Sequence, residues 1–316
     1  MGIKGLPAYV RKRCNDVHVP VPAAEFKNRF IAIDANSFTH RFAAGSMTCQ
    51  QYLVKFLNLI FNLKSEGVYP VFIFDGGAPK EKWEEQQRRR EAQDAIRAEI
   101  ERLEREDDDY GSNQDRIAAL SKRITTTPPE YKEALNEILD ALGIPVIRAP
   151  CEAERMCASL VKEKKVALAL SPDSDLWVYG IDIVATDFNP YDRQFSIVSP
   201  SNIIQTVGLT QPEWVDFCIM CGCDYNQNMP GIGPAKSFDL IQKYGSIENL
   251  PADRFDISVL NHQRCRELFQ CVPSGIAKIK NGTQQRELKT TLAKWGVEDY
   301  HAKMKGVSGK KRMTFQ

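Results

Sequence analysis

The sequence predicts an α/β fold with a central, mostly parallel sheet, and two observations lead to this prediction. Short apolar runs at residues 30–33 and 71–74 are typical of buried strands, and a stretch with helical spacing lies between them. Strand, helix and strand in succession form the unit from which parallel sheets are built. An acid follows each run, Asp34 and Asp75, and ligands of such sheets collect at the carboxyl ends of the strands.

Length and composition are those of a globular protein. The chain has 316 residues, of which 43% are hydrophobic and 26% charged, so it can form one large domain or two smaller ones. It lacks a run of about 18 apolar residues, so we expect no membrane span. The nine cysteines show no framework spacing and favour reduced thiols inside a cell. A DNA-binding protein is usually basic. The net charge of +1 therefore does not decide whether the chain binds DNA, and the distribution of the charges must decide it.

The densest group of acids lies between residues 149 and 179. It contains two pairs at i, i+2 spacing: Glu152 with Glu154, and Asp173 with Asp175. The second pair follows an apolar run of strand length, residues 166–170. Like charges at short range raise each other's pKa and destabilise the fold unless something cancels them. A hard divalent cation with oxygen ligands would do so, and the stretch therefore predicts half of a metal site.

Further elements follow from periodicity and turn signals. We expect a short basic helix near residue 13, a helix from a capping-box pattern at Thr48 to a stop at Gly67, helices over 131–142, 212–223 and 235–244, and a strand or hairpin over 186–199. Residues 79–124 alternate basic and acidic residues, which is typical of two charged helices joined by a turn; a solvated surface hairpin is the alternative. The pattern beyond residue 250 is helical, and the basic tail, 306–316, is expected to be mobile.

Seven short motifs occur in one order: MGIKGL (1–6), IAIDA (31–35), FIFDG (72–76), APCEAE (149–154), DSD (173–175), GCDY (222–225) and GIGP (231–234). As a set they resemble the structure-specific 5′ nuclease superfamily, and specifically its flap endonuclease branch. The resemblance implies a PIN-like three-layer α/β fold with a helical gateway and cap and a helix–two-turn–helix DNA-binding element. It implies a nuclease core in two halves, 1–78 and 130–225, a gateway and cap at 79–129, a helix–two-turn–helix region at 226–300 and a flexible tail at 301–316.

The resemblance also assigns site residues. It implies seven active-site acids as metal ligands: Asp34, Asp75, Glu152, Glu154, Asp173, Asp175 and Asp224. Lys82 and Arg89 would be the catalytic cations at the gateway base, with Asp34 and Asp173 as catalytic acids. DNA contacts would come from Gly2, His40, Lys122, Arg123, Gly231, Gly233 and Lys236; the family usually has a stacking tyrosine where this chain has His40. Two Mg²⁺ ions are implied, with Mn²⁺ as a substitute, and K⁺ at the turn around Gly231.

The implied activity is hydrolysis of branched double-stranded DNA with a 5′ flap, together with 5′–3′ exonuclease activity, by a monomer acting in replication, repair or recombination. The family's sliding-clamp motif is absent from the tail; residues 50–57 resemble it loosely, but we expect them to be buried on a core helix. A related 5′ exonuclease, an RNA exonuclease, a junction resolvase and a non-catalytic junction clamp stay open as alternatives. The expected location is intracellular, in the nucleus or, for a viral protein, at a cytoplasmic replication site.

Overall fold

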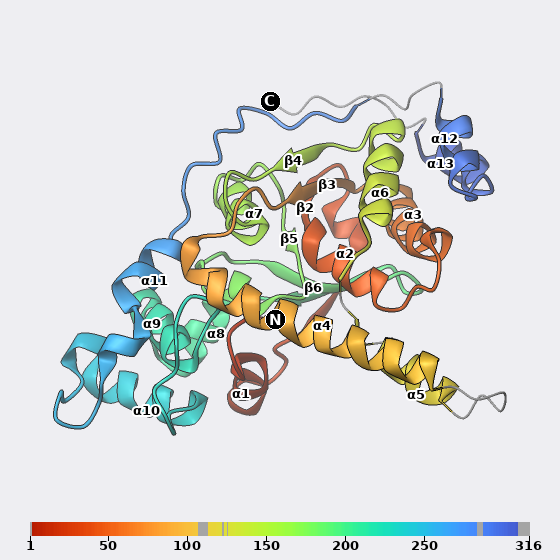
Figure 1. The fold of residues 1–316 in the computed structure, drawn as a ribbon. Coiled ribbons are helices and arrows are strands. Elements are labelled where there is room, and N and C mark those ends of the chain that lie inside the picture. The colour runs from red at the N-terminus through yellow and green to blue at the C-terminus, as the bar shows by residue number, and fades with distance from the viewer. Residues whose placement is uncertain (1, 107–112, 122, 125, 283–286, 309–316) are drawn as a thin grey trace.

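The computed structural model describes residues 2–106, 113–121, 123–124, 126–282 and 287–308. Their sheet has seven strands in the order β1-β7-β6-β5-β2-β3-β4 (Figure 1). The strands are β1 (Val19–Pro22), β2 (Phe30–Asp34), β3 (Tyr69–Phe74), β4 (Val146–Arg148), β5 (Ala169–Leu170), β6 (Val184–Asn189) and β7 (Gln194–Val198). The five strands from β6 to β4 are parallel, and β7 is antiparallel to both β6 and β1. The predicted mostly parallel α/β fold is confirmed.

Helices cover both faces of the sheet and make three layers. They are α1 (Leu6–Arg13), α2 (Ala35–Ala43), α3 (Cys49–Ser65), α4 (Trp83–Arg105), α5 (Gln114–Ser121), α6 (Pro129–Ala141), α7 (Ala153–Lys162), α8 (Pro200–Val207), α9 (Gln211–Cys221), α10 (Pro234–Tyr244), α11 (His262–Leu268), α12 (Leu288–Lys294) and α13 (Tyr300–Ser308). Side chains alternate across β2, so that Ala32 packs into the cluster of α1, α7 and α9, and its neighbours Ile31 and Ile33 into the cluster of α3 and α6. Among the described residues no helix has the length and apolarity that crossing a bilayer requires.

The strand ends place acids at one edge of the sheet. Asp34 is the last residue of β2, and its side chain accepts a hydrogen bond from the backbone N–H of Ser37 over 3.2 Å, which caps α2. Asp75 follows β3 directly. Asp173 lies just beyond β5 and caps the short 3₁₀ helix η3 (Ser174–Trp177). Because β2, β3 and β5 are parallel neighbours, their carboxyl ends meet at this edge.

Helix α3 begins as predicted but with half of a capping box. Thr48 accepts from the backbone N–H of Gln51 over 3.2 Å, whereas the Gln51 side chain accepts from the N–H of Met47 over 2.9 Å and not from that of Thr48. The apolar residues of the loose clamp-like motif, Tyr52, Leu53, Phe56 and Leu57, are fully buried. The prediction that this segment belongs to the core is confirmed.

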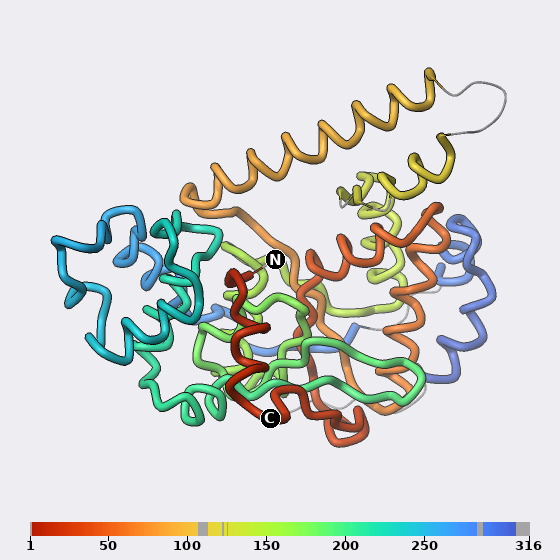
Figure 2. Tube along the Cα trace, turned by 90° about the horizontal axis from the view of Figure 1, so that it is seen from below, coloured from red at the N-terminus to blue at the C-terminus, as the bar shows by residue number. Residues whose placement is uncertain are grey.

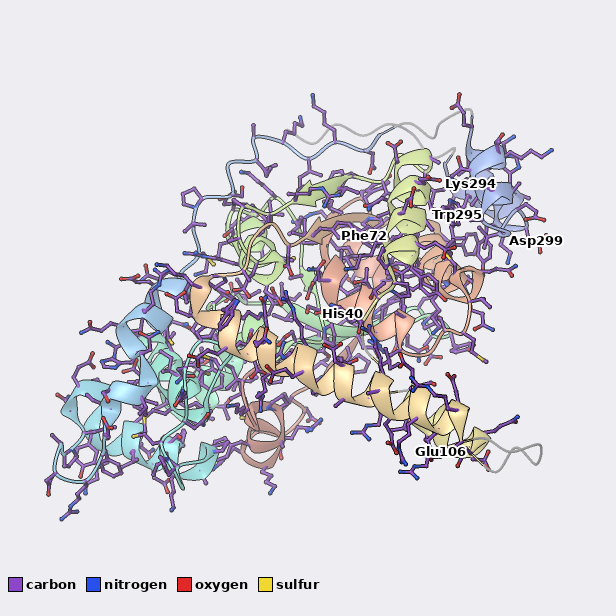
Figure 3. All side chains as sticks on the ribbon, in the orientation of Figure 1. His40, Phe72, Glu106, Lys294, Trp295 and Asp299 are labelled. Carbon is purple, nitrogen blue, oxygen red and sulfur yellow. The ribbon has the colours of Figure 1, made fainter. Side chains whose placement is uncertain are left out.

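Helices α4 and α5 form the projecting charged pair that the sequence predicts. Figure 2 shows α4 extending away from the sheet, and Figure 3 places Glu106 at its far end. Leu103 is the one buried residue of α4, and Arg116 of α5 reaches Glu99 of α4 over 2.7 Å. Few apolar contacts and many exposed ion pairs characterise this part of the chain. The predicted turn at 106–112 lies, except for Glu106, outside the described residues.

Four segments differ from the predictions. The strand expected over 166–170 is reduced to β5, Ala169–Leu170. The short strands β1 and β4 have exposed positions, and β1 contains two prolines, so neither shows the apolar pattern of a buried strand. Residues 301–308, predicted to begin a flexible tail, belong to α13, whose Met304 is fully buried.

The C-terminal helices α12 and α13 pack against the central α/β core and do not extend the helix–two-turn–helix region predicted for 226–300. Helix α12 packs on α6 and α13 packs on α3, and Figure 3 shows Lys294 and Trp295 beside α6. Glu137 of α6 accepts from Lys294 Nζ over 2.7 Å and from Trp295 Nε1 over 2.8 Å. An extended segment, residues 270–282, crosses the core between α11 and α12 and donates from Gly282 N–H to the carbonyl of Gly143 over 3.0 Å.

Candidate functional site

Seven acids that are far apart in the sequence converge at the carboxyl edge of the sheet. They come from β2 (Asp34), the residue after β3 (Asp75), the start of α7 (Glu152 and Glu154), η3 and the residue before it (Asp173 and Asp175) and the loop after α9 (Asp224). Asp34, Glu152, Asp173 and Asp175 are buried, and the side chain of Asp224 is 9% exposed. So many buried carboxylates at one edge are costly to fold unless partners neutralise them.

Ser171 connects two of these acids. Its hydroxyl donates to Asp34 Oδ2 over 2.7 Å and accepts from the backbone N–H of Asp173 over 3.1 Å. The carboxylate of Asp173 in turn accepts from the backbone N–H of Asp175 over 3.1 Å. The loop after β5 therefore fixes Asp173 and Asp175 relative to β2.

Asp75 is held by the start of α7. Its Oδ1 accepts from the backbone N–H of Ala153 over 2.7 Å, and its Oδ2 accepts from the Asn36 side-chain amide. A carboxylate at a helix N-terminus receives the free N–H groups and the positive end of the helix dipole. The same helix start carries Glu152 and Glu154, so this contact fixes three acids relative to one another.

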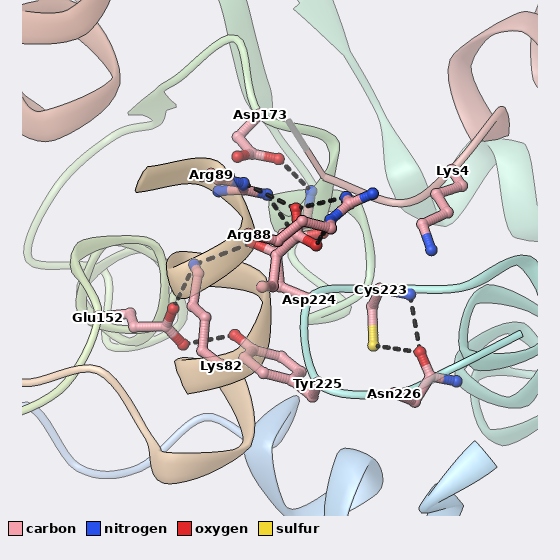
Figure 4. Close-up of polar contacts among 12 residues, drawn as sticks. Lys4, Lys82, Arg88, Arg89, Glu152, Asp173, Cys223, Asp224, Tyr225 and Asn226 are labelled. Atoms are coloured by element: carbon pink, nitrogen blue, oxygen red, sulfur yellow. Dashed lines mark hydrogen bonds and ion pairs between the residues drawn. The ribbon is translucent and has the colours of Figure 1, made fainter. Parts of the chain in front are cut away.

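Two cations from the base of α4 reach into the acids (Figure 4). Lys82 Nζ lies 2.6 Å from Glu152 Oε1 and 3.1 Å from Asp224 Oδ2, and Arg89 Nη2 lies 2.7 Å from Asp224 Oδ1. The Tyr225 hydroxyl donates to the other oxygen of Glu152. Residues 82 and 89 are seven positions apart, about two helical turns, so they share one face of the helix. The structure thus brings the predicted cations onto the predicted acids.

Burial shifts the proton affinities of the acids. It raises the pKa of Asp34 to about 6 despite the hydrogen bonds from Ser37 and Ser171. It also raises the pKa of Asp173, and it raises those of Glu154 and Asp175 well above their usual range, with neighbouring acid charges adding to the effect. Burial opposes the charge of Lys82, but the charges of Glu152, Glu154 and Asp224 outweigh it and raise the Lys82 pKa. Added positive charge at the site would therefore stabilise the ionised form of these acids.

The donor set fits a hard divalent cation, because it consists of carboxylate oxygens without a soft ligand. Asp175 Oδ1 is buried and has no hydrogen-bond partner among the described residues. Across all the residues that the structure describes, no three His, Cys, Asp or Glu side chains are already arranged as a metal site. Ion pairs with Lys82 and Arg89 and the capping bonds hold the carboxylates on separate partners. A bound ion would therefore compete with Lys82 for Glu152 and Asp224.

The N-terminal segment joins the acids to the turn before α10. A side chain at Gly2 would collide with the Asp173 carboxylate and the Ser174 hydroxyl, so the close approach requires glycine. Lys4 donates from its backbone N–H to the Gly222 carbonyl over 2.9 Å. A Cβ added at Gly5 would lie 3.0 Å from Pro234 Cγ. These contacts order the segment, and they place Gly2, a predicted DNA contact, beside Asp173.

The turn around Gly231 forms a separate polar site from the acids. Gly231 has a φ of 70°, and Gly233 precedes α10 without a side-chain cap. Lys236, in the first turn of α10, donates to the Gly231 carbonyl over 3.0 Å. Backbone N–H groups at such a helix start, with a lysine beside them, are suited to a phosphate.

Two of the remaining predicted DNA contacts, His40 and Arg123, lie near the chain that returns from α5. His40, on α2, is 3.5 Å from the Thr127 hydroxyl through Nδ1. The Arg123 side chain is exposed, and its carbonyl accepts from Gln93 of α4 over 3.3 Å. Lys122 lies outside the described residues.

A cavity of about 640 Å³ opens beside Asp224, between the base of α4 and the loop at 223–228. Cations and acids both line it: Lys4, Lys80 and Arg88, and Glu81, Glu84 and Glu85. Since Lys82 and Arg89 come from the adjacent face of α4, the cavity continues the acidic cluster toward Val259 and Asn261, which precede α11.

Three residues without a predicted role hold the acids, namely Asn36, Ser171 and Tyr225. Each contacts an acid far away in the sequence, for example Ser171 and Asp34 at a separation of 137 residues. The available signal was local: each of the three lies within two residues of a predicted site acid. Polar residues within two positions of a predicted site acid are therefore the ones that the sequence alone could have indicated as part of the site.

Two family models match the chain. The XPG N-terminal domain matches residues 1–96, and the XPG I-region matches residues 143–224. The two regions contain all seven acids. Flap endonuclease 1 of Xiphophorus maculatus is 32% identical over 270 residues, which cover 79% of this chain and 68% of the relative.

Solved structures share the fold. The catalytic core of Rad2 in complex with a DNA substrate has a TM-score of 0.72 at 18% identity and covers 97% of this chain and 100% of its own. Flap endonuclease-1 from Methanococcus jannaschii has a TM-score of 0.65 at 18% identity and covers 92% of this chain and 96% of its own. At these identities the structural likeness concerns the fold.

Proposed function

The chain belongs to the flap endonuclease family of structure-specific nucleases, and from this premise we propose that the seven acids form the site at which it cleaves branched DNA with a 5′ flap. Nucleases of this family hydrolyse phosphodiesters with the help of metal ions, generally Mg²⁺. The observation that carries the proposal is the convergence of seven carboxylates at one sheet edge with Lys82 and Arg89 on them.

We propose that Glu152, Glu154, Asp173 and Asp175 hold two Mg²⁺ ions, with Asp34, Asp75 and Asp224 completing the site and Mn²⁺ as a substitute. Two such ions supply charge neutralisation at the phosphate, an activated water and stabilisation of the leaving oxygen. Support comes from the raised pKa values, which show the demand for cations, and from the free Oδ1 of Asp175. Mg²⁺ retains several waters, so some of the seven acids would act through water.

Lys82 and Arg89 are proposed to stabilise the negative charge that develops on the scissile phosphate. Both reach the acids from one face of α4 and are held there by Glu152 and Asp224. Positive groups fixed beside the reacting phosphate act most strongly where water is excluded, and the Lys82 side chain is only 15% exposed. The high pKa keeps Lys82 charged, so it binds the phosphate and takes no proton from it.

The duplex is proposed to bind at the turn around Gly231 and Gly233, with Lys236 on its phosphates. The N-terminal segment that joins this turn to Asp173 sets the spacing between the held duplex and the cleaved bond. A K⁺ ion is proposed to bind at the turn, with backbone carbonyl oxygens of the turn as its ligands. His40 and Arg123, beside the chain returning from α5, are proposed to contact the DNA strand nearest the cut, together with Lys122.

We propose that the 5′ single strand passes the gateway formed by α4 and α5. The exposed charged faces of these helices support a path for a phosphate backbone. A bulky streptavidin cap on a biotinylated 5′ end, added before the enzyme, should then prevent cutting. Unimpeded cutting of the capped flap would favour the junction-resolvase alternative, and release of mononucleotides from a nicked duplex would support the proposed 5′–3′ exonuclease activity.

The assignment of the acids is tested with Asp173→Ala and a 5′-labelled flap substrate. Cleavage in Mg²⁺ should be abolished, while flap binding measured in Ca²⁺ stays within a few-fold of wild type. Asp253→Ala is the matched control, because Asp253 is 76% exposed and, among the described residues, pairs only with Arg254, at 3.7 Å. Retained cleavage by Asp173→Ala would refute the site, and binding without cleavage by the wild-type protein would favour the non-catalytic clamp.

A monomer acting in DNA replication, repair or recombination is proposed. The intracellular location stays a prediction. Size-exclusion chromatography with light scattering, with and without flap DNA, tests the monomer.

A further inference from the structure

The short 3₁₀ helix η2 (Lys80–Lys82) carries two side chains with different partners. Lys82 pairs with two of the seven acids, Glu152 and Asp224. Its neighbour Glu81 pairs with the C-terminal part of the chain, by which we mean residues 211–268 from α9 to α11. Glu81 Oε1 lies 2.9 Å from Arg264 Nε of α11. The Glu81 side chain is 17% exposed, and Arg264 is 44% exposed. This ion pair therefore lies one residue away from the cation that faces the scissile phosphate in the proposed function.

Hydrogen bonds to α9 and α7 fix the position of α11, which carries Arg264. Arg266, on the same helix, donates to both oxygens of the buried Asp216 of α9, over 2.7 Å and 2.6 Å. From α7, Arg155 donates to the carbonyls of Glu267 and Gln270 over 3.2 Å and 2.8 Å. Residues two apart on a helix point about 200° apart, so Arg266 holds α11 to α9 while Arg264 faces η2.

The Glu81–Arg264 pair is the one ion pair, among the described residues, that joins η2 or α4 to the C-terminal part without using a proposed metal ligand. The other pairs that join them, Lys82 and Arg89 with Asp224, involve an acid that is expected to bind metal. Metal or phosphate binding would weaken those pairs, because the same charges are then used elsewhere. The Glu81–Arg264 pair would persist throughout the reaction.

We propose that Arg264 is a positioning residue that holds the base of α4, through Glu81, so that Lys82 lies over the metal site when DNA is bound. The proposal rests on the proposed function of Lys82 as the cation that stabilises the phosphate. It adds a connection from the DNA-holding C-terminal part, through α9 and α11, to the gateway base. Arg264 touches neither the acids nor the DNA in this role and acts only through Glu81.

A small displacement is enough to make this contact matter for the rate. Misplacing a catalytic group by about 1 Å can cost on the order of 100-fold in rate. Lys82 follows Glu81 directly in η2, so a shift of η2 would move the Lys82 ammonium group relative to the phosphate that it is proposed to stabilise. Removing the pair should therefore reduce the rate of the chemical step and leave DNA affinity unchanged.

The test measures single-turnover cleavage of a 5′-flap substrate by wild type, Arg264→Ala, Glu81→Gln and the double variant. Each single variant should lower the saturated cleavage rate by about 10-fold, with the half-saturating enzyme concentration unchanged. The double variant should be no slower than the singles, because one interaction is lost in all three. Arg264→Lys should restore most of the rate, since a lysine can still reach Glu81.

Glu267→Ala is the matched control. Glu267 also pairs with Arg264, over 2.6 Å on the same helix, and its loss should leave the rate unchanged because the Glu81 contact remains. Additive losses in the double variant, or an equal loss in Glu267→Ala, would overturn the proposal. A lower melting temperature with an unchanged saturated rate would do the same, as it would show a purely structural role.

A second readout does not depend on cleavage. Backbone hydrogen exchange across residues 80–89 of the DNA-bound protein should be faster in Arg264→Ala than in wild type and unchanged in Glu267→Ala. Unchanged exchange in Arg264→Ala would overturn the proposal, even with the variant fully folded by circular dichroism. If wild type fails to cleave in Mg²⁺, the proposed function fails, and hydrogen exchange still decides whether Arg264 holds η2.

Discussion

The Ser171 hydroxyl donates to Asp34 Oδ2 over 2.7 Å and accepts from the backbone N–H of Asp173 over 3.1 Å. Two acids from different strands are thus aligned by one fully buried side chain. Ser171→Ala should remove this alignment. We expect Mg²⁺ affinity, measured as the ion concentration that gives half-maximal cleavage, to fall by about 10- to 100-fold, as is typical for residues that orient metal ligands.

Ser159→Ala is the control for loss of a buried hydroxyl. Ser159 is 1% exposed, and its hydroxyl donates to the Arg155 carbonyl of its own helix, outside the site. Its removal should leave the Mg²⁺ dependence unchanged. An equal Mg²⁺ requirement for Ser171→Ala and wild type would contradict the aligning role.

We expect the Asp175 carboxylate to lower the free energy of unfolding of the metal-free protein while it supports Mg²⁺-dependent cleavage. Burial, together with the charges of Asp173 and Asp224, raises the pKa of Asp175 well above its usual range, and its Oδ1 has no hydrogen-bond partner among the described residues. A neutral amide of similar shape avoids this repulsion. Asp175→Asn should therefore raise the free energy of unfolding without metal by about 1 kcal/mol and reduce Mg²⁺-dependent cleavage.

Thermal melts with EDTA and with Mg²⁺ test this prediction. Mg²⁺ should raise the melting temperature of wild type, because binding to the native state stabilises it, and should raise that of Asp175→Asn less. A destabilised variant in EDTA would show that the Asp175 charge is neutralised by some other group.

The sequence is sufficient to predict the parallel sheet and the cluster of acids. Buried strands such as β2 and β3 consist of apolar residues, and a strand end places its acid at a known edge of the sheet. The strands β1 and β4 escape prediction because they are short and partly exposed, and their pairing is settled by neighbours such as β7 and β3. Propensity carries little information in such edge strands.

Contacts between side chains distant in the sequence are the other part that could not be predicted. Nothing near Glu81 indicates that Arg264, 183 residues later, lies beside it. The same holds for α13, whose polar composition suggests a mobile tail although Met304 is buried beside α3. In both cases the tertiary arrangement, and not the local pattern, determines the contact.

Trp83 offers a built-in reporter of the gateway. It follows Lys82 at the start of α4 and is 63% exposed, whereas Trp177 and Trp214 are buried and Trp295 is half-buried. A single strand passing the gateway should cover it. Flap DNA should therefore reduce iodide quenching of tryptophan fluorescence in wild type, more than a matched duplex without a flap does, and the difference should be lost in Trp83→Phe.

A stacking contact would also contribute to affinity. Base–aromatic stacking is worth about 1–3 kcal/mol per base, so Trp83→Ala should weaken flap binding by at least about fivefold. Tyr191→Ala is the control, because Tyr191 is 93% exposed in the turn between β6 and β7. Equal effects of the two substitutions on flap binding would contradict a gateway contact at Trp83.

We expect the contact that holds the extended segment 270–282 to Glu163 to weaken at low pH. Its carboxylate accepts from Lys165 Nζ over 2.6 Å and from the Ser274 backbone N–H over 2.7 Å. Burial opposes the charge, but these hydrogen bonds outweigh it and lower the pKa of Glu163 from 4.5 to about 2. Because the folded pKa lies below the unfolded one, this contribution is complete above about pH 4.5 and is lost as the pH falls toward 2.

Glu163→Gln should consequently lower the free energy of unfolding near neutral pH by about 1–3 kcal/mol. The difference from wild type, measured by urea unfolding, should shrink as the pH is lowered through the interval between the two pKa values. Glu104→Gln serves as the control, since Glu104 is exposed on α4 and should show no such pH-dependent difference. A stability difference that stays constant from neutral pH to about pH 3 would mean that the Glu163 charge does not hold the segment.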